Sequence, residues 1–341
     1  MPPSADLIEA ARDALLLASA VCRNVQQRLD QVRAMTKDDR SPVTVADFAS
    51  QAVVCAVLED HLGDEFADTP MVGEETGEYL RLPEHASHLA ATVEAARQVL
   101  PDMDEERLLS LIDRGADSGE AERFWTLDPI DGTKGFLGSR QYAIALGLVQ
   151  NGAPVVGVLA CPNLPLDPKG SLDVADPQGS LYVAVKGDGA QELPCIPAPA
   201  AQARRLPRLE PVNDRPILAC ASVEKAHSNI GDAERLLRHL GGNPNPVRLD
   251  SAGKYAVVAR GQADCYLRLP TRKGYVDKIW DHAAGTVVAT EAGAVVTDIY
   301  GRKLDFSHGR GLEKNRGVIV AAPGAHAKII KGIAELKIGE L

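Results

Sequence analysis

The sequence predicts a layered protein with an α+β first half and an α/β second half. Three observations support this fold class. Helical periodicity dominates up to Gly63 and then gives way to consecutive apolar runs between 124 and 186. Strand-like and helical patterns alternate from 217 to 337, as they do when helices pack on a sheet. Prolines accumulate between 193 and 216 and predict a linker between the two halves.

Composition and length narrow the class of protein. The chain has 341 residues, of which 45% are apolar, and its 37 Lys and Arg against 47 Asp and Glu give a formal net charge of −10. Disordered chains lack this apolar content, and nucleic-acid-binding proteins usually carry a basic excess, so we expect neither disorder nor a nucleic-acid partner. The length predicts two domains or one large layered domain. The predicted linker favours two domains, 1–200 and 215–341, with a cleft between them.

No targeting or membrane segment is predicted. The longest early apolar run, 14–22, is shorter than the roughly 20 residues of a bilayer span, and Asp6 and Glu9 argue against a signal or transit peptide. The cysteines lie far apart and form no CxxC pair, which predicts reduced, buried thiols. We therefore expect a cytoplasmic protein with no membrane partner.

The first half is predicted to begin with two helices. Apolar residues recur every three or four positions from Leu7 to Leu29, and Ser4 is a suitable N-cap. A charged loop over 33–41 precedes a second helical period that starts at Val45 and ends at Gly63. A short strand at 71–75, mostly helical structure over 85–114, and strands at 124–127, 142–149, 153–160 and 181–186 complete this half.

In the second half the patterns alternate. Strands are predicted at 217–221, 263–269, 294–299 and 317–321, and helices at 229–240, 251–260, 280–291 and 323–337.

The segment that carries most chemistry follows the apolar run at 124–127. Asp128 and Asp131 are three residues apart, Pro129 fixes one φ and Gly132 frees the backbone, so both carboxylates and the Ile130 carbonyl can point at one place. Such an all-oxygen cluster suits Mg²⁺. If Thr133 opens a helix, its N-terminal amides would face the same spot and could bind phosphate. A surface Asp-Pro turn explains the segment equally well on its own.

Other carboxylates are open to simpler interpretations. Glu74 and Glu75 follow the predicted strand at 71–75 and could be a solvated loop, and Asp281 could be the N-cap of the helix after it. Thr44 and Asp47 have the spacing of a near capping box, which the residues alone slightly favour. His227 precedes a helix and reads most simply as a loop residue.

Taken together, the motifs at 72–75, 128–133 and 280–285 closely resemble the metal-binding signatures of the lithium-sensitive inositol-monophosphatase-like superfamily. Longer segments are similar to its 3'(2'),5'-bisphosphate nucleotidase branch, and the likeness extends from about residue 5 to 335. These segments are 41–47, 160–165, 223–228, 249–255 and 266–270.

The resemblance implies alternating α and β layers with a metal site between two sub-domains. It also implies Mg²⁺-dependent, lithium-sensitive hydrolysis of adenosine 3',5'-bisphosphate to AMP and phosphate, with 3'-phosphoadenylyl sulfate as a further substrate. Two alternatives stay open, an inositol 1,4-bisphosphate 1-phosphatase and a catalytically silent sensor that binds the nucleotide. We expect a monomer whose partner is the small nucleotide substrate.

Residue roles also follow from the resemblance. Two or three Mg²⁺ ions would be held by Glu74, Asp128, the Ile130 carbonyl, Asp131 and Asp281. Asp47 and Thr133 match the pair that orients and deprotonates the attacking water, which replaces the capping-box interpretation of Asp47. The substrate would be held by Gly132, Thr133, His227, Ser251, Lys254, Arg268 and Asp281.

Two points remain open at this stage. Glu75 could lie outside the ligand set or bind a further, weaker metal. Residues 271–276 could form a wall of the pocket or an exposed basic loop.

Overall fold

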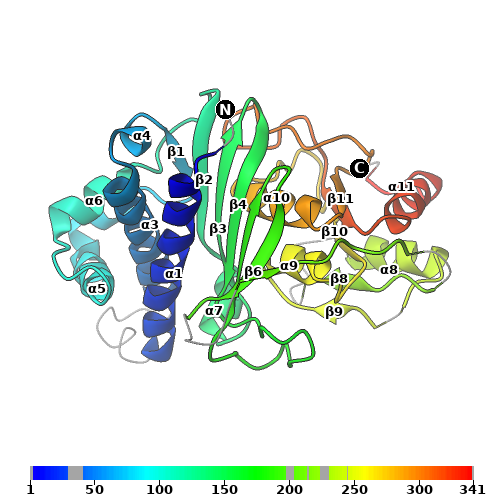
Figure 1. Cartoon of the computed structure of the whole chain (residues 1–341), viewed down its shortest axis with the longest axis horizontal. Coiled ribbons are helices and arrows are strands. Elements are labelled where there is room, and N and C mark those ends of the chain that lie inside the picture. The colour runs from blue at the N-terminus through cyan, green and yellow to red at the C-terminus, as the bar shows by residue number, and fades with distance from the viewer. Residues whose placement is uncertain are drawn as a thin grey trace.

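The computed structural model describes residues 3–29, 41–196, 203–212, 215–222, 230–243 and 245–339. Within these residues, helices and two sheets alternate in layers (Figure 1). Helices α1 (Ala5–Gln27) and α3 (Ser41–Leu62) cover one face of a seven-stranded sheet. Helices α9 (Gly253–Ala259) and α10 (Ala283–Glu291) separate it from a five-stranded sheet, and α8 (Ile230–His239) and α11 (Ala325–Glu335) lie beyond. The predicted layered fold is confirmed.

The first two helices form much as predicted. The Ser4 hydroxyl accepts a hydrogen bond from the Leu7 amide at 3.2 Å, so Ser4 is the N-cap of α1. Helix α3 already begins at Ser41, which places Thr44 and Asp47 inside the helix. The capping-box interpretation of these two residues is therefore wrong, because a capping box needs its first residue at the N-cap.

Smaller helices pack around this pair. They are α4 (Asp64–Ala67), α5 (Ala86–Arg97), α6 (Glu105–Asp113), α7 (Thr133–Leu137) and the 3₁₀ turns η1 (Tyr79–Arg81) and η2 (Pro83–His85).

The seven strands of the first sheet lie in chain order, with β1 parallel to β2 and the remaining pairs antiparallel. They are β1 (Met71–Gly73), β2 (Arg123–Asp131), β3 (Ala143–Gln150), β4 (Ala153–Cys161), β5 (Ser180–Val185), β6 (Gly189–Pro194) and β7 (Arg204–Arg205).

Strands β6 and β7 correct the predicted linker. Part of the proline-rich region pairs with the sheet, and the chain after it stays bonded, with the Leu209 amide donating to the Ala292 carbonyl at 2.8 Å. The strand pattern of β6 was hidden because its inward residue Glu192 is charged. That carboxylate is buried and accepts hydrogen bonds from the Tyr182 hydroxyl and from Arg204.

The second sheet has the order β11-β12-β10-β8-β9. Its strands are β8 (Ala219–Ala221), β9 (Val247–Arg248), β10 (Cys265–Arg268), β11 (Val295–Thr297) and β12 (Val318–Ala321). Strand β8 runs parallel to β9 and β10, and β12 runs antiparallel to both its neighbours. The sequence did not predict β9, which has only two residues.

Helix α10 links the two sheets. It packs against β3 and β4 of the first sheet at two glycines. A Cβ atom on Gly157 would lie 2.4 Å from the Ala284 carbonyl oxygen, and one on Gly147 would lie 2.9 Å from the Ala283 Cβ. The absence of these side chains lets a helix of the second half rest directly on the sheet of the first half.

Two further predictions concern the cysteines and membrane-spanning segments. All six cysteines are buried and unpaired, as predicted. Among the described helices, none combines the length and the hydrophobicity that crossing a bilayer requires.

Candidate active site

Strand β2 ends in a β-bulge that brings its two aspartates together. Asp128 pairs with Ala145 and Asp131 pairs with Ala143, so three steps along β2 match two steps along β3. In a regular strand, residues three apart point to opposite faces, and the extra residue of a bulge cancels this alternation. The Ser50 hydroxyl of α3 donates to the Pro129 carbonyl at 3.1 Å and supports the bulge.

Strand β1 delivers a third carboxylate to the same place. It runs parallel to β2 with Gly73 opposite Leu127, and the Glu74 amide donates to the Leu127 carbonyl at 3.1 Å. Glu74 therefore leaves the sheet beside Asp128.

Gly132 and Thr133 follow the bulge. Gly132 has φ +100°, a left-handed conformation that suits glycine, and Thr133 is the first residue of α7. The conditional prediction that Thr133 opens a helix is thus confirmed.

A cavity of about 700 Å³ lies between the two halves of the chain. Eight of the predicted site residues line it, namely Glu74, Asp128, Ile130, Asp131, Gly132, Thr133, Arg268 and Asp281. The first six come from the residue after β1, from β2 and from the start of α7, and the last two from β10 and the turn before α10. Residues more than 200 positions apart in the sequence, such as Glu74 and Asp281, thus meet in one cavity.

The carboxylates of this region repel one another. Burial, together with the charges of Asp281, Glu75 and Asp131, raises the pKa of Glu74 to about 8. Burial and the neighbouring carboxylates also raise the pKa of Asp128. Glu74 faces the cavity, where solvent reaches its side chain although protein surrounds it. A cluster of like charges of this kind is stabilised by protons or by a cation.

Arg268 is a positively charged side chain that is hydrogen-bonded to Asp281. Its Nη2 donates to Asp281 Oδ2 at 3.3 Å and its Nε donates to Asp277 Oδ1 at 2.6 Å. Burial raises the pKa of Asp281, and the Arg268 charge opposes that rise. Asp281 was considered as an N-cap, but His282 occupies that position and Asp281 precedes it.

Several predicted residues do not line the cavity. Asp47 lies in α3 behind it, where burial and the charges of Glu75 and Glu74 raise its pKa. Lys254 is 5% exposed and its Nζ lies 5.1 Å from the centre of the Tyr266 ring. The Ser251 hydroxyl accepts from the Gly253 amide at 3.1 Å, and its Cβ would be 3.0 Å from a Cβ on Gly132.

His227 falls outside the described residues. Glu75 is absent from the cavity lining; its backbone is held by Gln51, whose Nε2 donates to the Glu75 carbonyl at 2.8 Å.

The loop over 271–276 forms part of the cavity wall. Thr271, Arg272 and Tyr275 line it, and the Arg272 guanidinium lies 5.2 Å from the centre of the Tyr275 ring. Residues 271–274 are also exposed, so the loop is both a wall of the cavity and an exposed basic loop. The wall also contains Lys134 and Asp250. Asp250 lies in the segment 249–255, for which the resemblance was noted, but no role was predicted for it.

The residues present fit a divalent cation. All candidate side-chain ligands are carboxylates, which Mg²⁺ prefers. Asp128 Oδ1 is buried and has no hydrogen-bond partner in the described part of the chain, as expected for an oxygen kept for another ligand. As the described side chains lie, no three Asp, Glu, His or Cys residues form an arrangement that could already hold a metal ion.

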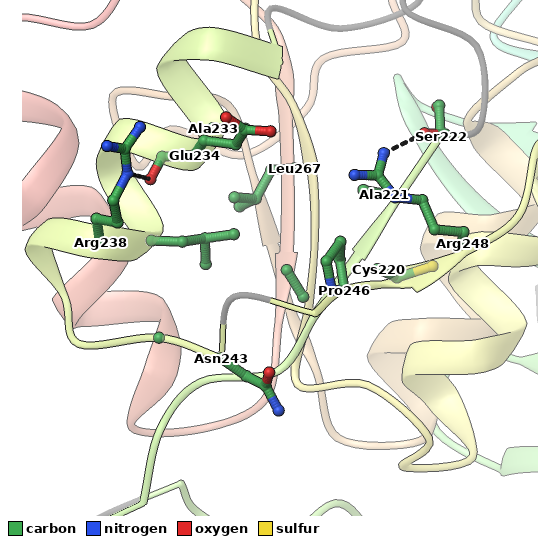
Figure 2. Close-up of a pocket in the computed structure, with 13 residues that line it drawn as sticks. Cys220, Ala221, Ser222, Ala233, Glu234, Arg238, Asn243, Pro246, Arg248 and Leu267 are labelled. Carbon is green, nitrogen blue, oxygen red and sulfur yellow. Dashed lines mark hydrogen bonds between the residues drawn. The ribbon is translucent and has the colours of Figure 1, made fainter.

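A second pocket, of about 340 Å³, lies between α8 and the strands β8, β9 and β10 (Figure 2). Its lining is mostly apolar, and Figure 2 shows Arg238 and Arg248 on opposite sides of it. Glu234 is the one carboxylate among its lining residues, and none of the described site residues lies there. This pocket therefore lacks the ligands for a cation.

Known proteins resemble the chain over nearly its whole length. Residues 5–337 match the inositol monophosphatase family. The chain is 39% identical over 346 residues to a 3'(2'),5'-bisphosphate nucleotidase of Schizosaccharomyces pombe, covering 96% of this chain and 93% of the relative. It is 40% identical over 348 residues to a protein of the same name from Oryza sativa, covering 98% and 95%.

Solved structures show the same fold. CysQ from Bacteroides thetaiotaomicron, a bacterial member of the inositol monophosphatase family, matches with a TM-score of 0.59 at 23% identity, over 92% of this chain and 96% of that one. An inositol monophosphatase from Anabaena matches with a TM-score of 0.58 at 20% identity, over 98% and 96%. The chain, with its layered sheets and its carboxylate-lined cavity, belongs to the inositol monophosphatase family.

Proposed function

We propose that the protein is a 3'(2'),5'-bisphosphate nucleotidase that hydrolyses the 3'-phosphate of adenosine 3',5'-bisphosphate to give AMP and phosphate. The observation that carries this proposal is that the cavity lining combines four carboxylates, here called the acidic part (Glu74, Asp128, Asp131 and Asp281), with the guanidinium groups of Arg268 and Arg272. A substrate with two phosphate groups fits this combination of cation ligands and positively charged side chains. Relatives with 39 and 40% identity bear the name of this activity.

The acidic part is the proposed site for Mg²⁺. The inositol monophosphatase family is generally Mg²⁺-dependent. Two or three ions would be held by Glu74, Asp128, Asp131, Asp281 and the Ile130 carbonyl. When bound, Mg²⁺ supplies positive charge to the phosphoryl group and lowers the pKa of the attacking water.

Asp47 and Thr133 are proposed to orient that water and to accept its proton. Two observations support this pairing of residues from distant segments. Helix α3, which carries Asp47, contacts α7, which begins at Thr133. The Ser50 hydroxyl also ties α3 to the bulge before Thr133. The Thr133 hydroxyl and the Asp47 carboxylate would together accept the proton of the water that attacks the phosphorus.

The remaining predicted residues are proposed to hold the nucleotide. The Gly132 and Thr133 amides would bind the transferred phosphate, and Arg268 would present its guanidinium to the 5' side, with Arg272 beside it. Lys254 lies behind the wall, so its contribution would be charge rather than direct contact. His227 and Ser251 are also proposed to hold the nucleotide, with the His227 imidazole at the adenosine.

A substrate panel tests the proposal. Phosphate release from adenosine 3',5'-bisphosphate, 3'-phosphoadenylyl sulfate and inositol 1,4-bisphosphate is measured with Mg²⁺, with EDTA and with added Li⁺. We expect the highest kcat/KM on adenosine 3',5'-bisphosphate, loss of activity in EDTA, and inhibition by Li⁺. A higher kcat/KM on inositol 1,4-bisphosphate would favour the 1-phosphatase, and tight nucleotide binding without phosphate release would favour a sensor.

The Arg268→Ala variant tests the nucleotide-specific role in the same substrate panel. We expect it to lower kcat/KM for the nucleotide more than for inositol bisphosphate, since the proposed role of Arg268 is specific to the nucleotide. Equal losses on both substrates would contradict that role.

We further propose that the enzyme acts as a monomer in the cytoplasm. Its buried free thiols suit a reducing compartment.

A further inference from the structure

Arg310 lies outside the cavity lining and outside all the motifs, yet its side chain makes several contacts next to the site. Its Nη1 donates to the carbonyl oxygens of Gly115 at 3.1 Å and Asp117 at 2.9 Å, and its Nη2 donates to that of Gly73 at 2.5 Å. Its guanidinium carbon lies 4.8 Å from the centre of the Trp280 ring. One side chain thus contacts both Gly73, which precedes Glu74, and Trp280, which precedes Asp281.

The backbone around Arg310 holds the Asp281 side of this connection. The Ile279 amide donates to the Arg310 carbonyl at 3.3 Å, and the Leu312 amide donates to the Asp277 carbonyl at 2.8 Å. Lys278 and Gly311 form an antiparallel bridge between these hydrogen bonds. The segment that leads into Asp281 is therefore paired with the segment that carries Arg310.

The Arg310 side chain holds the Glu74 side. The Gly73 carbonyl is its acceptor, and the Gly73 amide donates to the Gly115 carbonyl at 2.9 Å, which Arg310 also binds. A planar guanidinium can donate in several directions while its face lies on an aromatic ring, which a lysine ammonium cannot do to the same extent. Arg310 therefore connects the end of β1 in the first half to the turn before α10 in the second half.

We infer that Arg310 is a positioning residue that sets the separation of Glu74 and Asp281 and, through it, the affinity for Mg²⁺. The inference rests on the proposed function, in which both carboxylates bind Mg²⁺. Outer contacts that orient metal ligands typically change metal affinity about 10–100-fold when they are removed. Arg310 does not line the cavity, so its contacts act through the Gly73 carbonyl and the Trp280 ring, and its charge also attracts Glu74.

Mg²⁺ binding without substrate tests the inference. Isothermal titration calorimetry of the full chain gives the Kd for Mg²⁺ in the wild type, Arg310→Lys and Arg310→Met. We expect Arg310→Lys to raise the Kd about tenfold and Arg310→Met to raise it up to about 100-fold. Lysine keeps the charge and can still donate hydrogen bonds from its ammonium group, but it lacks the planar fork of the guanidinium, so it should rescue part of the affinity that methionine loses. At saturating Mg²⁺ the KM for adenosine 3',5'-bisphosphate should stay within about twofold.

Arg114 provides a matched control. Its Nη2 donates to the carbonyls of Phe66, Ala67 and Thr69, and its guanidinium carbon lies 4.6 Å from the centre of the Phe66 ring. This is the same type of connection, but it holds the chain before β1 and contacts no proposed ligand segment. We expect Arg114→Lys to lower Tm about as much as Arg310→Lys while the Kd for Mg²⁺ stays within about twofold.

The outcomes separate this inference from the proposed function. An unchanged Kd in Arg310→Lys and Arg310→Met, with an active Mg²⁺-binding wild type, would overturn the inference alone. Equal weakening by Arg114→Lys would also overturn it, since the effect would then be general destabilisation. A wild type that binds no Mg²⁺ would overturn both. If Arg310→Met does not fold, the comparison of Arg310→Lys with Arg114→Lys decides.

Discussion

The carboxylate of Asp131 accepts a hydrogen bond from the backbone amide of Ala252. Asp131 ends β2 in the first half, and Ala252 directly precedes α9 in the second half. A residue proposed to bind Mg²⁺ is therefore also a direct contact between the two halves. Its charge and its hydrogen-bonding capacity can be separated by substitution.

We predict that Asp131→Asn lowers kcat about 100-fold or more, because the charge that would bind Mg²⁺ is lost. Its Tm should stay close to that of the wild type, since the amide oxygen can still accept from Ala252. Asp131→Ala should lose activity and also about 1–3 kcal/mol of stability, since it leaves the Ala252 amide without its acceptor. Phosphate release and thermal unfolding check both variants. A fully active Asp131→Asn enzyme would contradict the assignment.

Gly132 is predicted to resist any side chain. Any other residue at this position would be strained by the φ of +100°. A Cβ atom on residue 132 would also lie 3.0 Å from the Ser251 Cβ. We expect Gly132→Ala to lower both Tm and kcat. Gly187, with φ +92° and nothing within 4 Å of a Cβ, is the control. Gly187→Ala should cost only about 1 kcal/mol of stability and leave kcat unchanged. If the two alanine variants lowered kcat equally, the contact between residue 132 and Ser251 would be unimportant for activity.

The Thr133 hydroxyl is predicted to serve in proton transfer. Thr133→Val keeps the shape of the side chain and removes the hydroxyl, so kcat should fall by about 10²–10⁴-fold, the usual contribution of a general base. Thr133→Ser keeps the hydroxyl and should retain most of the activity. The Kd for Mg²⁺, measured by calorimetry, should be similar in both. Comparable activity of the valine and serine variants would rule out this role.

Stability without metal should depend on pH. The pKa of Glu74 rises on folding from 4.5 to about 8, so the folded protein binds this proton more tightly than the unfolded chain does. Stability from this group is therefore full at low pH and is lost as pH rises from the lower value through the higher one. In EDTA we expect Tm to fall between about pH 6 and about pH 8, and Mg²⁺ to restore it most at the higher pH.

Two measurements define that prediction. Thermal unfolding is followed across this pH window with EDTA and with Mg²⁺, for the wild type and for Glu74→Gln. The glutamine variant carries no charge at this position, so its Tm in EDTA should vary less with pH. A wild-type Tm that rose with pH in EDTA would contradict the like-charge cluster as its origin.

The convergence of Asp128 and Asp131 could be predicted from the sequence because it depends on local geometry, whereas Glu74 and Asp281 were grouped with them by the resemblance to the family. Pro129, Gly132 and the spacing of Asp128 and Asp131 already indicated convergence at the end of a strand. The physical cause, a β-bulge opposite Ala143 and Ala145, was not visible because it depends on how β2 pairs with β3.

Other features could not be read from local patterns. Strand β6 was not predicted because buried Glu192 interrupts its apolar alternation, and its partners, among them Tyr182 and Arg204, explain the burial. Only its last two residues, 193 and 194, fell in the predicted linker. Arg310 has no motif around it, and its acceptors lie about 200 residues away in the chain. Lys254 was expected at the substrate, and its burial under Tyr266 follows from packing alone.

The glycine contacts beneath α10 bear on the order in which the proposed site forms during synthesis. A ribosome releases the residues of the first sheet before those of α10, so Glu74, Asp128 and Asp131 can be in place while Asp281 is still unmade. Only when α10 settles on Gly147 and Gly157 does the last carboxylate reach its neighbours. The full set of proposed Mg²⁺ ligands would thus come together only after α10 has been synthesised and has packed on the first sheet.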